Sequence, residues 1–397
     1  MIKLKKYYSG QTRLFKKRIG IFFLLSTLTL LIVNCTQPLV LKFISANENG
    51  YYMFGKIPAR SFYEDTSIDE NLLPLWSVET SGSQNSTSIV IYKDILFVSD
   101  LAGKIYGFDW ISGKEIGFEK YSGSIPVAPV INGLRMFLLV NNLNERYSTL
   151  KNYDLTGGKV LTESVIAGSV QNEMLKLSDG IIVLSDNGEL IKFNLVGTRE
   201  WSVPTKVSSK SSPASNGNLI LFGNENGELI AISASNGEIK YRKKISDGIE
   251  GDLSIDGVNA YFGDNKGNLV SVTVEDGNIN WQFNTKSKIL VTPVFDESKI
   301  IVGNLAGDIF CLNKSNGKLK WKTSTGGVIN TTPLLLQNYL IQPDLNKKVY
   351  FIDTQNGDVK KIYEFERRVK LSPVLYDGIL YLGADKGIIN AYKTVSK

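Results

Sequence analysis

Side chains that could carry out acid–base or metal chemistry are few in this sequence. Its 397 residues include no histidine, so the commonest general base and metal ligand is missing. The two cysteines, Cys35 and Cys311, cannot form a zinc cluster, no glycine-rich loop opens a helix, and no serine stands beside a recognisable base. The sequence therefore predicts no catalytic residue, no metal site and no cofactor. A carboxylate site assembled from distant segments is the enzymatic alternative.

The carboxylates that could form such a site recur at regular intervals along the chain. Asp109, Asp154 and Asp353 each precede a turn, and Asn194 and Asn313 stand at the same point of other units. Carboxylate and amide oxygens at this position accept hydrogen bonds from backbone amides of the turn. The spacing thus indicates turn formation and not a paired acid and base.

A 40-residue repeat governs the order of strands and turns. In each unit a hairpin loop is followed by an alternating strand and a turn ending in glycine, and four units have a Trp or Tyr four residues later (Trp201, Tyr241, Trp281 and Trp321). A period of 40 to 45 residues with four short strands per unit is typical of a propeller blade. The turn glycines are Gly113, Gly157, Gly197, Gly237, Gly277, Gly317 and Gly357.

The two ends of the repeat region complete one another. The stretch from Leu72 resembles the last strand of a blade, with Trp76 at the position of Trp281 and Trp321, and the final residues before Lys397 supply only three strands. Pairing of these pieces would close the ring and remove its exposed edges. We therefore predict an all-β fold, an eight-bladed β-propeller over residues 72–397, closed by an N-terminal strand that pairs with the C-terminal blade.

The N-terminus has the layout of an export signal. Seven basic residues before residue 19 precede an uncharged apolar run and then Cys35, as in bacterial lipoproteins whose cysteine carries the lipid. We predict a signal peptide over 1–34, lipidation of Cys35 and a tether over 35–71. Asn34 stands where a small residue is usual, so an uncleaved membrane anchor and simple cleavage are the alternatives. All three place the fold outside the cytoplasm.

Charge on the remaining chain argues against nucleic acid as a partner. Without the seven N-terminal charges, 38 basic and 39 acidic residues remain, which gives a net charge of −1. Lysines and arginines in the connections between blades are interleaved with acids, and we expect them to form a solvated rim.

A long hairpin loop and a cysteine are the remaining candidate sites. The hairpin loop between Val140 and Leu150 is about four residues longer than its equivalents and carries Asn144, Arg146 and Tyr147. Because Arg and Tyr are enriched at interfaces, these residues are candidate partner contacts; a tolerated surface insertion is the alternative. Cys311 aligns with small residues of other units, so we expect it to be a buried packing residue.

The unit endings DGNINW, SNGKLKW and SNGEIKY, with a preceding strand such as LVSVT, resemble the repeat of the pyrroloquinoline-quinone-type β-propellers over residues 72–397. One group with this repeat, the quinoprotein dehydrogenases, is much longer and holds a quinone and calcium with added loops and a disulfide between adjacent cysteines. The second group is the BamB family of lipoproteins of the outer-membrane β-barrel assembly machinery. The chain resembles this family in length, blade number and its lipobox-type start, with Cys35 at the lipidated position.

The resemblance to the second group implies a non-enzymatic scaffold. It would be lipid-anchored at the periplasmic side of the outer membrane, bind the β-barrel assembly subunit and unfolded outer-membrane proteins, and work as a monomeric ring within a complex. The alternatives are a quinone-dependent oxidoreductase and an exported propeller that binds another envelope ligand. Inner-membrane anchoring and a soluble periplasmic location are the alternatives for its place in the cell.

Overall fold

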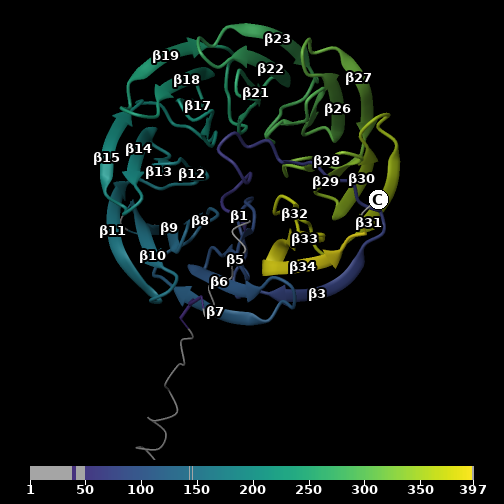
Figure 1. Ribbon diagram of the computed structural model, residues 1–397. Coiled ribbons are helices and arrows are strands. Elements are labelled where there is room, and N and C mark those ends of the chain that lie inside the picture. The colour runs from purple at the N-terminus through teal and green to yellow at the C-terminus, as the bar shows by residue number, and fades with distance from the viewer. Residues whose placement is uncertain (1–37, 42–49, 143, 145, 396–397) are drawn as a thin grey trace, which may run out of the picture. The chain divides into compact units, whose positions relative to one another are not determined.

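Apolar runs bounded by Gly- and Asn-rich turns fold into eight antiparallel sheets, arranged as the blades of a propeller (Figure 1). The computed structural model describes residues 38–41, 50–142, 144 and 146–395. In each blade the first strand lies nearest the ring axis and the fourth lies at the rim. The predicted all-β, eight-bladed propeller is confirmed.

The first four blades use consecutive strands of the chain, which pair as simple meanders. Blade 1 contains β4 (Val90–Tyr92), β5 (Ile95–Ser99), β6 (Lys104–Asp109) and β7 (Glu115–Lys120). Blade 2 contains β8 (Val130–Asn132), β9 (Arg135–Asn142), β10 (Tyr147–Asp154) and β11 (Lys159–Ala167). Blade 3 contains β12 (Leu175–Lys176), β13 (Gly180–Leu184), β14 (Glu189–Asn194) and β15 (Arg199–Pro204). Blade 4 contains β16 (Ala214–Ser215), β17 (Leu219–Gly223), β18 (Glu228–Ser233) and β19 (Ile239–Lys244).

The other four blades continue the pattern, except that the last one borrows its outer strand from the N-terminal side. Blade 5 contains β20 (Ser254–Ile255), β21 (Asn259–Gly263), β22 (Asn268–Thr273) and β23 (Ile279–Asn284). Blade 6 contains β24 (Val294–Phe295), β25 (Lys299–Gly303), β26 (Asp308–Asn313) and β27 (Leu319–Ser324). Blade 7 contains β28 (Leu334–Leu336), β29 (Tyr339–Pro343), β30 (Lys348–Asp353) and β31 (Val359–Glu364). Blade 8 contains β32 (Val374–Tyr376), β33 (Ile379–Ala384), the short 3-10 helix η1 (Asp385–Gly387), β34 (Ile388–Lys393) and β3 (Leu73–Glu79).

The core lies between neighbouring blades. All five residues of β25 are buried, whereas the rim strand β27 alternates between exposed and more buried residues. This difference explains why the second strands read as continuous apolar runs. Side chains such as Phe222 and Phe262 are fully buried, and each side chain of this kind contributes about 1.5–3 kcal/mol relative to an exposed position.

The ring closes as the sequence predicts. β3 pairs antiparallel with β34, with Trp76 opposite Ala391, and the amide of Thr80 donates to the carbonyl of Gly387 at 2.9 Å. The strand that begins at the N-terminal side is therefore the fourth strand of blade 8, and no blade in the described part of the chain is left with three strands.

The aromatic residue of the rim strand fastens blades 4, 5 and 6 each to the next blade. Its polar atom donates to a backbone carbonyl 33 residues further along the chain, in the next blade's turn. The pairs are Tyr241 Oη with Val274 (2.9 Å), Trp281 Nε1 with Lys314 (3.0 Å) and Trp321 Nε1 with Thr354 (3.1 Å). In blade 3 the corresponding carbonyl, that of Ala234, accepts instead from Lys192 Nζ at 3.2 Å, and the buried Nε1 of Trp201 has no partner among the described residues.

The tether is shorter than predicted, because residues 50–72 fold onto the ring. β1 (Gly50–Tyr51) pairs with β4 as a fifth strand of blade 1, and β2 (Tyr63–Glu64) pairs in parallel with β28 of blade 7. We call residues 50–64 the strap; in Figure 1 it crosses the middle of the ring from β1 towards β28. Its apolar side chains Met53 and Phe62 are buried, but they follow neither the repeat nor an alternating pattern.

Candidate functional site

The strap carries a buried arginine at the middle of the ring. The side chain of Arg60 has no exposed surface, and its backbone has a positive φ of 53°. Its guanidinium nitrogens donate to four backbone carbonyls, one in the strap and three in the blades. The acceptors are Pro213 (2.7 Å, from Nε), Glu173 (3.1 Å) and Met174 (3.2 Å, both from Nη2), and Phe54 (3.4 Å, from Nη1).

Two buried carboxyl groups contribute to the electrostatics of Arg60. Burial raises the pKa of Glu173 to about 8, although the charge of Arg60 opposes this change. Burial also raises the pKa of Asp252, again against the effect of Arg60. Burial lowers the pKa of Arg60, and the two carboxyl groups oppose that shift. The charge of Arg60 therefore influences both carboxyl groups, while its four hydrogen bonds to backbone carbonyls hold the strap to the ring.

Sequence reasoning missed this cluster, although the repeat contains a signal for it. At the repeat position of Glu173 and Asp252 five other blades have Ser or Thr, namely Ser88, Ser212, Thr292, Thr332 and Ser372, and blade 2 has Ala128. The backbone amide at this position donates to the side chain at the same position of the next blade. Examples are Ala128 to Glu173 (3.0 Å), Glu173 to Ser212 (3.0 Å), Ser212 to Asp252 (2.6 Å) and Thr292 to Thr332 (3.1 Å). Two carboxylates in a series of hydroxyl residues indicate a local cationic partner.

The strap also bonds to the inner strands of the blades. Among the described strands, β1 pairs with the inner strand β4 and β2 with β28, while the other inner strands have no strand on the side facing the axis. In several blades a backbone amide at one repeat position bonds to the strap. Strap carbonyls accept these amides in blades 2, 4, 5 and 7. The bonds are Ile131 to Tyr52 (2.9 Å), Ser215 to Pro58 (2.9 Å), Ile255 to Ala59 (2.8 Å) and Leu335 to Phe62 (2.9 Å).

A pocket of about 680 Å³ opens between the strap and the hairpins that follow the inner strands of blades 3 to 6. Ile57, Pro58 and Ala59 form its wall on the strap side, and Phe295 lies on the side of blade 6. Polar groups at its edge include Glu297. A mainly apolar pocket of about 300–1,000 Å³ with few polar groups is the usual form of a binding site. We take this pocket as the candidate functional site.

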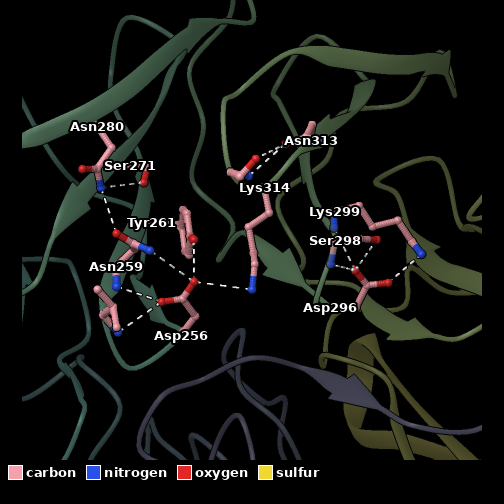
Figure 2. A network of polar contacts seen from close by, with 12 residues as sticks. Asp256, Asn259, Tyr261, Ser271, Asn280, Asp296, Ser298, Lys299, Asn313 and Lys314 are labelled. Carbon is pink, nitrogen blue, oxygen red and sulfur yellow. Dashed lines mark hydrogen bonds and ion pairs between the residues drawn. The ribbon is translucent and has the colours of Figure 1, made fainter.

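A second, more polar pocket of about 460 Å³ adjoins the first at the seam between blades 5 and 6, and the two share Asp256, Glu297 and Lys314. Figure 2 shows the polar contacts of this seam. The Asp256 carboxylate accepts from Tyr261 Oη at 2.7 Å and lies 3.4 Å from Lys314 Nζ. Burial alone would raise the pKa of Asp256, but these contacts lower it. We call the two pockets together the groove.

The residues predicted as sites lie elsewhere. Cys35 is outside the described residues. Asn144 and Arg146 are exposed, and Tyr147 is partly buried at the start of β10. The carbonyl of Arg146 accepts the amide of Gly168, in the connection to blade 3, at 3.0 Å, so this loop lies beside the connections between blades. The structure thus brings Asn144, Arg146 and Tyr147 together in one loop, and none of them lines the groove.

Cys311 is fully buried in β26, as predicted, and burial raises the pKa of its thiol to about 12. Among the described residues, no group of three or more His, Cys, Asp or Glu side chains is placed to hold a metal ion. Within the same part of the chain, no helix is long and apolar enough to span a membrane.

Comparison with known proteins gives matches to families and to solved structures. The family described as outer membrane protein assembly factor BamB matches residues 129–282 and 265–394. The crystal structure of BamB from Moraxella catarrhalis is similar with a TM-score of 0.70 and 16% identity, over 81% of this chain and 100% of that chain. No protein of curated function matches the sequence.

Two enzymes share the fold at lower identity. Quinohemoprotein alcohol dehydrogenase from Comamonas testosteroni has a TM-score of 0.70 and 10% identity, over 87% of this chain and 80% of that chain. A europium-containing methanol dehydrogenase has a TM-score of 0.72 and 10% identity, over 86% of this chain and 91% of that chain. At such identities the likeness concerns the fold alone.

Proposed function

Because the chain belongs to the outer membrane protein assembly factor BamB family, we propose that it is a non-enzymatic scaffold that helps assemble β-barrel proteins of the outer membrane. The family match extends from residue 129 to residue 394, and this observation carries the proposal. Its partners are the β-barrel assembly subunit and unfolded outer-membrane proteins. The ring acts as a monomer that presents its loops and the groove to these partners.

The location follows from the same proposal. The protein is anchored at the periplasmic side of the outer membrane by a lipid on Cys35, after removal of the signal peptide over residues 1–34. Replacing Cys35 with alanine then releases the ring from the membrane fraction, and labelling with a radioactive fatty acid is lost from the same variant.

The loop between β9 and β10 is the second contact surface in this proposal. Asn144 and Arg146 are exposed there, and Arg side chains are enriched at the centres of protein interfaces. Tyr147 lies at its base, where its backbone pairs with Asn142 and Ala167. The loop and the groove offer two separate surfaces for two kinds of partner.

Co-purification tests the scaffold function. The full-length chain carrying a C-terminal affinity tag is isolated from detergent-solubilised membranes, and the bound proteins are identified by mass spectrometry. The β-barrel assembly subunit is expected in the eluate, and its absence from a preparation of folded, membrane-bound protein contradicts the proposal. Reduction of a dye after addition of quinone and calcium would instead support an oxidoreductase.

A further inference from the structure

The strap leaves one inner-strand amide of the groove without a partner. Phe295 occupies in blade 6 the repeat position of Ser215 and Ile255, whose amides bond to the strap at 2.9 and 2.8 Å. No acceptor bonds to the amide of Phe295 among the described residues. Leu375 of blade 8 likewise has no bond to the strap, but it does not line either pocket of the groove.

The amide of Phe295 points away from its own hairpin. Asp296 donates to the carbonyl of Lys299 at 3.1 Å, so these two residues form a hydrogen-bonded pair. Hydrogen-bonded and non-hydrogen-bonded pairs alternate along antiparallel strands. Phe295 pairs with Ile300 in the next, non-hydrogen-bonded position, and its amide is therefore directed towards the axis. It is a free strand-edge donor beside the 680 Å³ pocket.

The sequence departs from the repeat where this donor lies. Lys314 replaces the small or apolar Ala234 and Val274 of blades 4 and 5. It extends over the ring of Phe295, with Nζ 5.0 Å from the ring centroid, and reaches Asp256 of blade 5 (Figure 2). Asn280 likewise replaces a lysine that blades 4, 6 and 7 have at this point. Departures that the fold does not require are expected at functional sites.

The charge of the groove is complementary to a basic partner. Asp256 is paired with Lys314, and Asp296 with Lys299 at 2.6 Å. Glu297 lines both pockets, is exposed, and has no ion pair among the described residues. The carboxylate of Glu297 therefore lies without a counter-charge beside the mainly apolar pocket.

We infer that the groove binds an extended polypeptide segment by adding it to the inner edge of blade 6. A backbone carbonyl of the segment accepts the amide of Phe295, as strap carbonyls accept the equivalent amides of other blades. An apolar side chain packs against Ile57 and Phe295, and a neighbouring Lys or Arg pairs with Glu297. The inference rests on the proposed function, which supplies partners and clients with such segments.

Photo-crosslinking from the groove tests this inference. Benzoylphenylalanine is placed in the full-length chain in living cells at Ile57, which lines the groove and is 44% exposed, or at Val258, which follows the lining residue Gly257 and is 67% exposed. The attached peptides are identified by mass spectrometry. We expect segments with a basic residue next to an apolar one, and about tenfold lower yield when Glu297→Lys is added. Glu366→Lys, a reversal of an exposed acid outside the groove, is the matched control and should leave the yield unchanged.

The outcomes separate this inference from the proposed function. Crosslinks to the assembly subunit from position 146 but none from positions 57 and 258 would support the scaffold function and contradict the binding of a segment in the groove. Groove crosslinks that are insensitive to Glu297→Lys, or that lack basic residues, would overturn it as well. Basic segments attached only from proteins that are neither the assembly subunit nor outer-membrane proteins would support the groove as a peptide site and contradict the proposed function. Equal urea midpoints for the Glu297→Lys and Glu366→Lys variants show that both rings are folded.

Discussion

Replacing Arg60 with methionine tests how the strap is held to the ring. Methionine retains an apolar stem but removes the guanidinium group. That group donates to four backbone carbonyls at 2.7 to 3.4 Å and is the positive charge beside Glu173 and Asp252. The variant therefore leaves four buried carbonyls without their donor and removes the positive charge near Asp252.

The expected loss in the free energy of unfolding is about 3–5 kcal/mol, because four buried carbonyls lose a charged donor and Asp252 loses the nearby positive charge. Arg135→Met is the matched control. Arg135 forms a single ion pair with Asp154 at 3.0 Å, and its side chain is 38% exposed. Losing a surface pair of this kind costs at most about 1 kcal/mol.

The assay is urea unfolding of the full-length variants at neutral pH, followed by tryptophan fluorescence. The midpoint should fall at least about threefold further for Arg60→Met than for Arg135→Met. Adding Asp252→Asn to Arg60→Met should recover part of the loss, because it removes one carboxylate that lacks a counter-charge. Equal midpoints for the two single variants would refute the ionic account of the strap.

Three other variants probe the blades and the buried cluster. Trp321→Phe should cost about 1 kcal/mol more than Trp201→Phe in urea unfolding, because only Trp321 donates its Nε1 proton to a carbonyl; equal losses would contradict this. Gly317→Ala should lower the melting temperature more than Gly217→Ala, as measured by calorimetry. Both glycines have a positive φ, but only at Gly317 would an added Cβ meet a ring, that of Trp281 at 2.6 Å. The pKa of Glu173 is about 8 in the folded protein, against an ordinary value of 4.5, so the folded state holds this proton more tightly than the unfolded state. The free energy of unfolding should therefore fall as the pH rises between these two values. Glu173→Gln should remove the contribution of this group, so that the free energy of unfolding falls less between about pH 5 and about pH 8.5.

The fold could be predicted because each blade repeats the same local physics. Turn residues, continuous apolar runs and a rim Trp or Tyr recur every 40 residues, and they are enough to count the blades. Ring closure could be predicted because the strand of Trp76 resembles the last strand of a blade but lacks the three strands that should precede it. The pairing of Trp76 with Ala391 confirms this prediction.

The strap and the groove could not be predicted in the same way. Strap residues contact several blades, Met53 at β12 of blade 3 and Arg60 beside the inner strands of blades 3 and 4, so their pattern is set by the ring and not by a repeat of their own. The free amide of Phe295 depends on where the strap runs, which the sequence does not reveal. The carboxylates Glu173 and Asp252 were the accessible signal, since they interrupt a series of hydroxyl residues.

Closure by β3 also determines when the protein can finish folding. The amide of Thr80 and the carbonyl of Gly387, 307 positions apart in the chain, meet only after nearly all of the polypeptide is available. Contacts of such long range slow folding. The segment that is synthesised early must therefore wait, with the unpaired edge of β3 open to other strands, until the last blade has been synthesised. A chaperone that covers this edge during that time would protect the chain when it is most prone to mispairing.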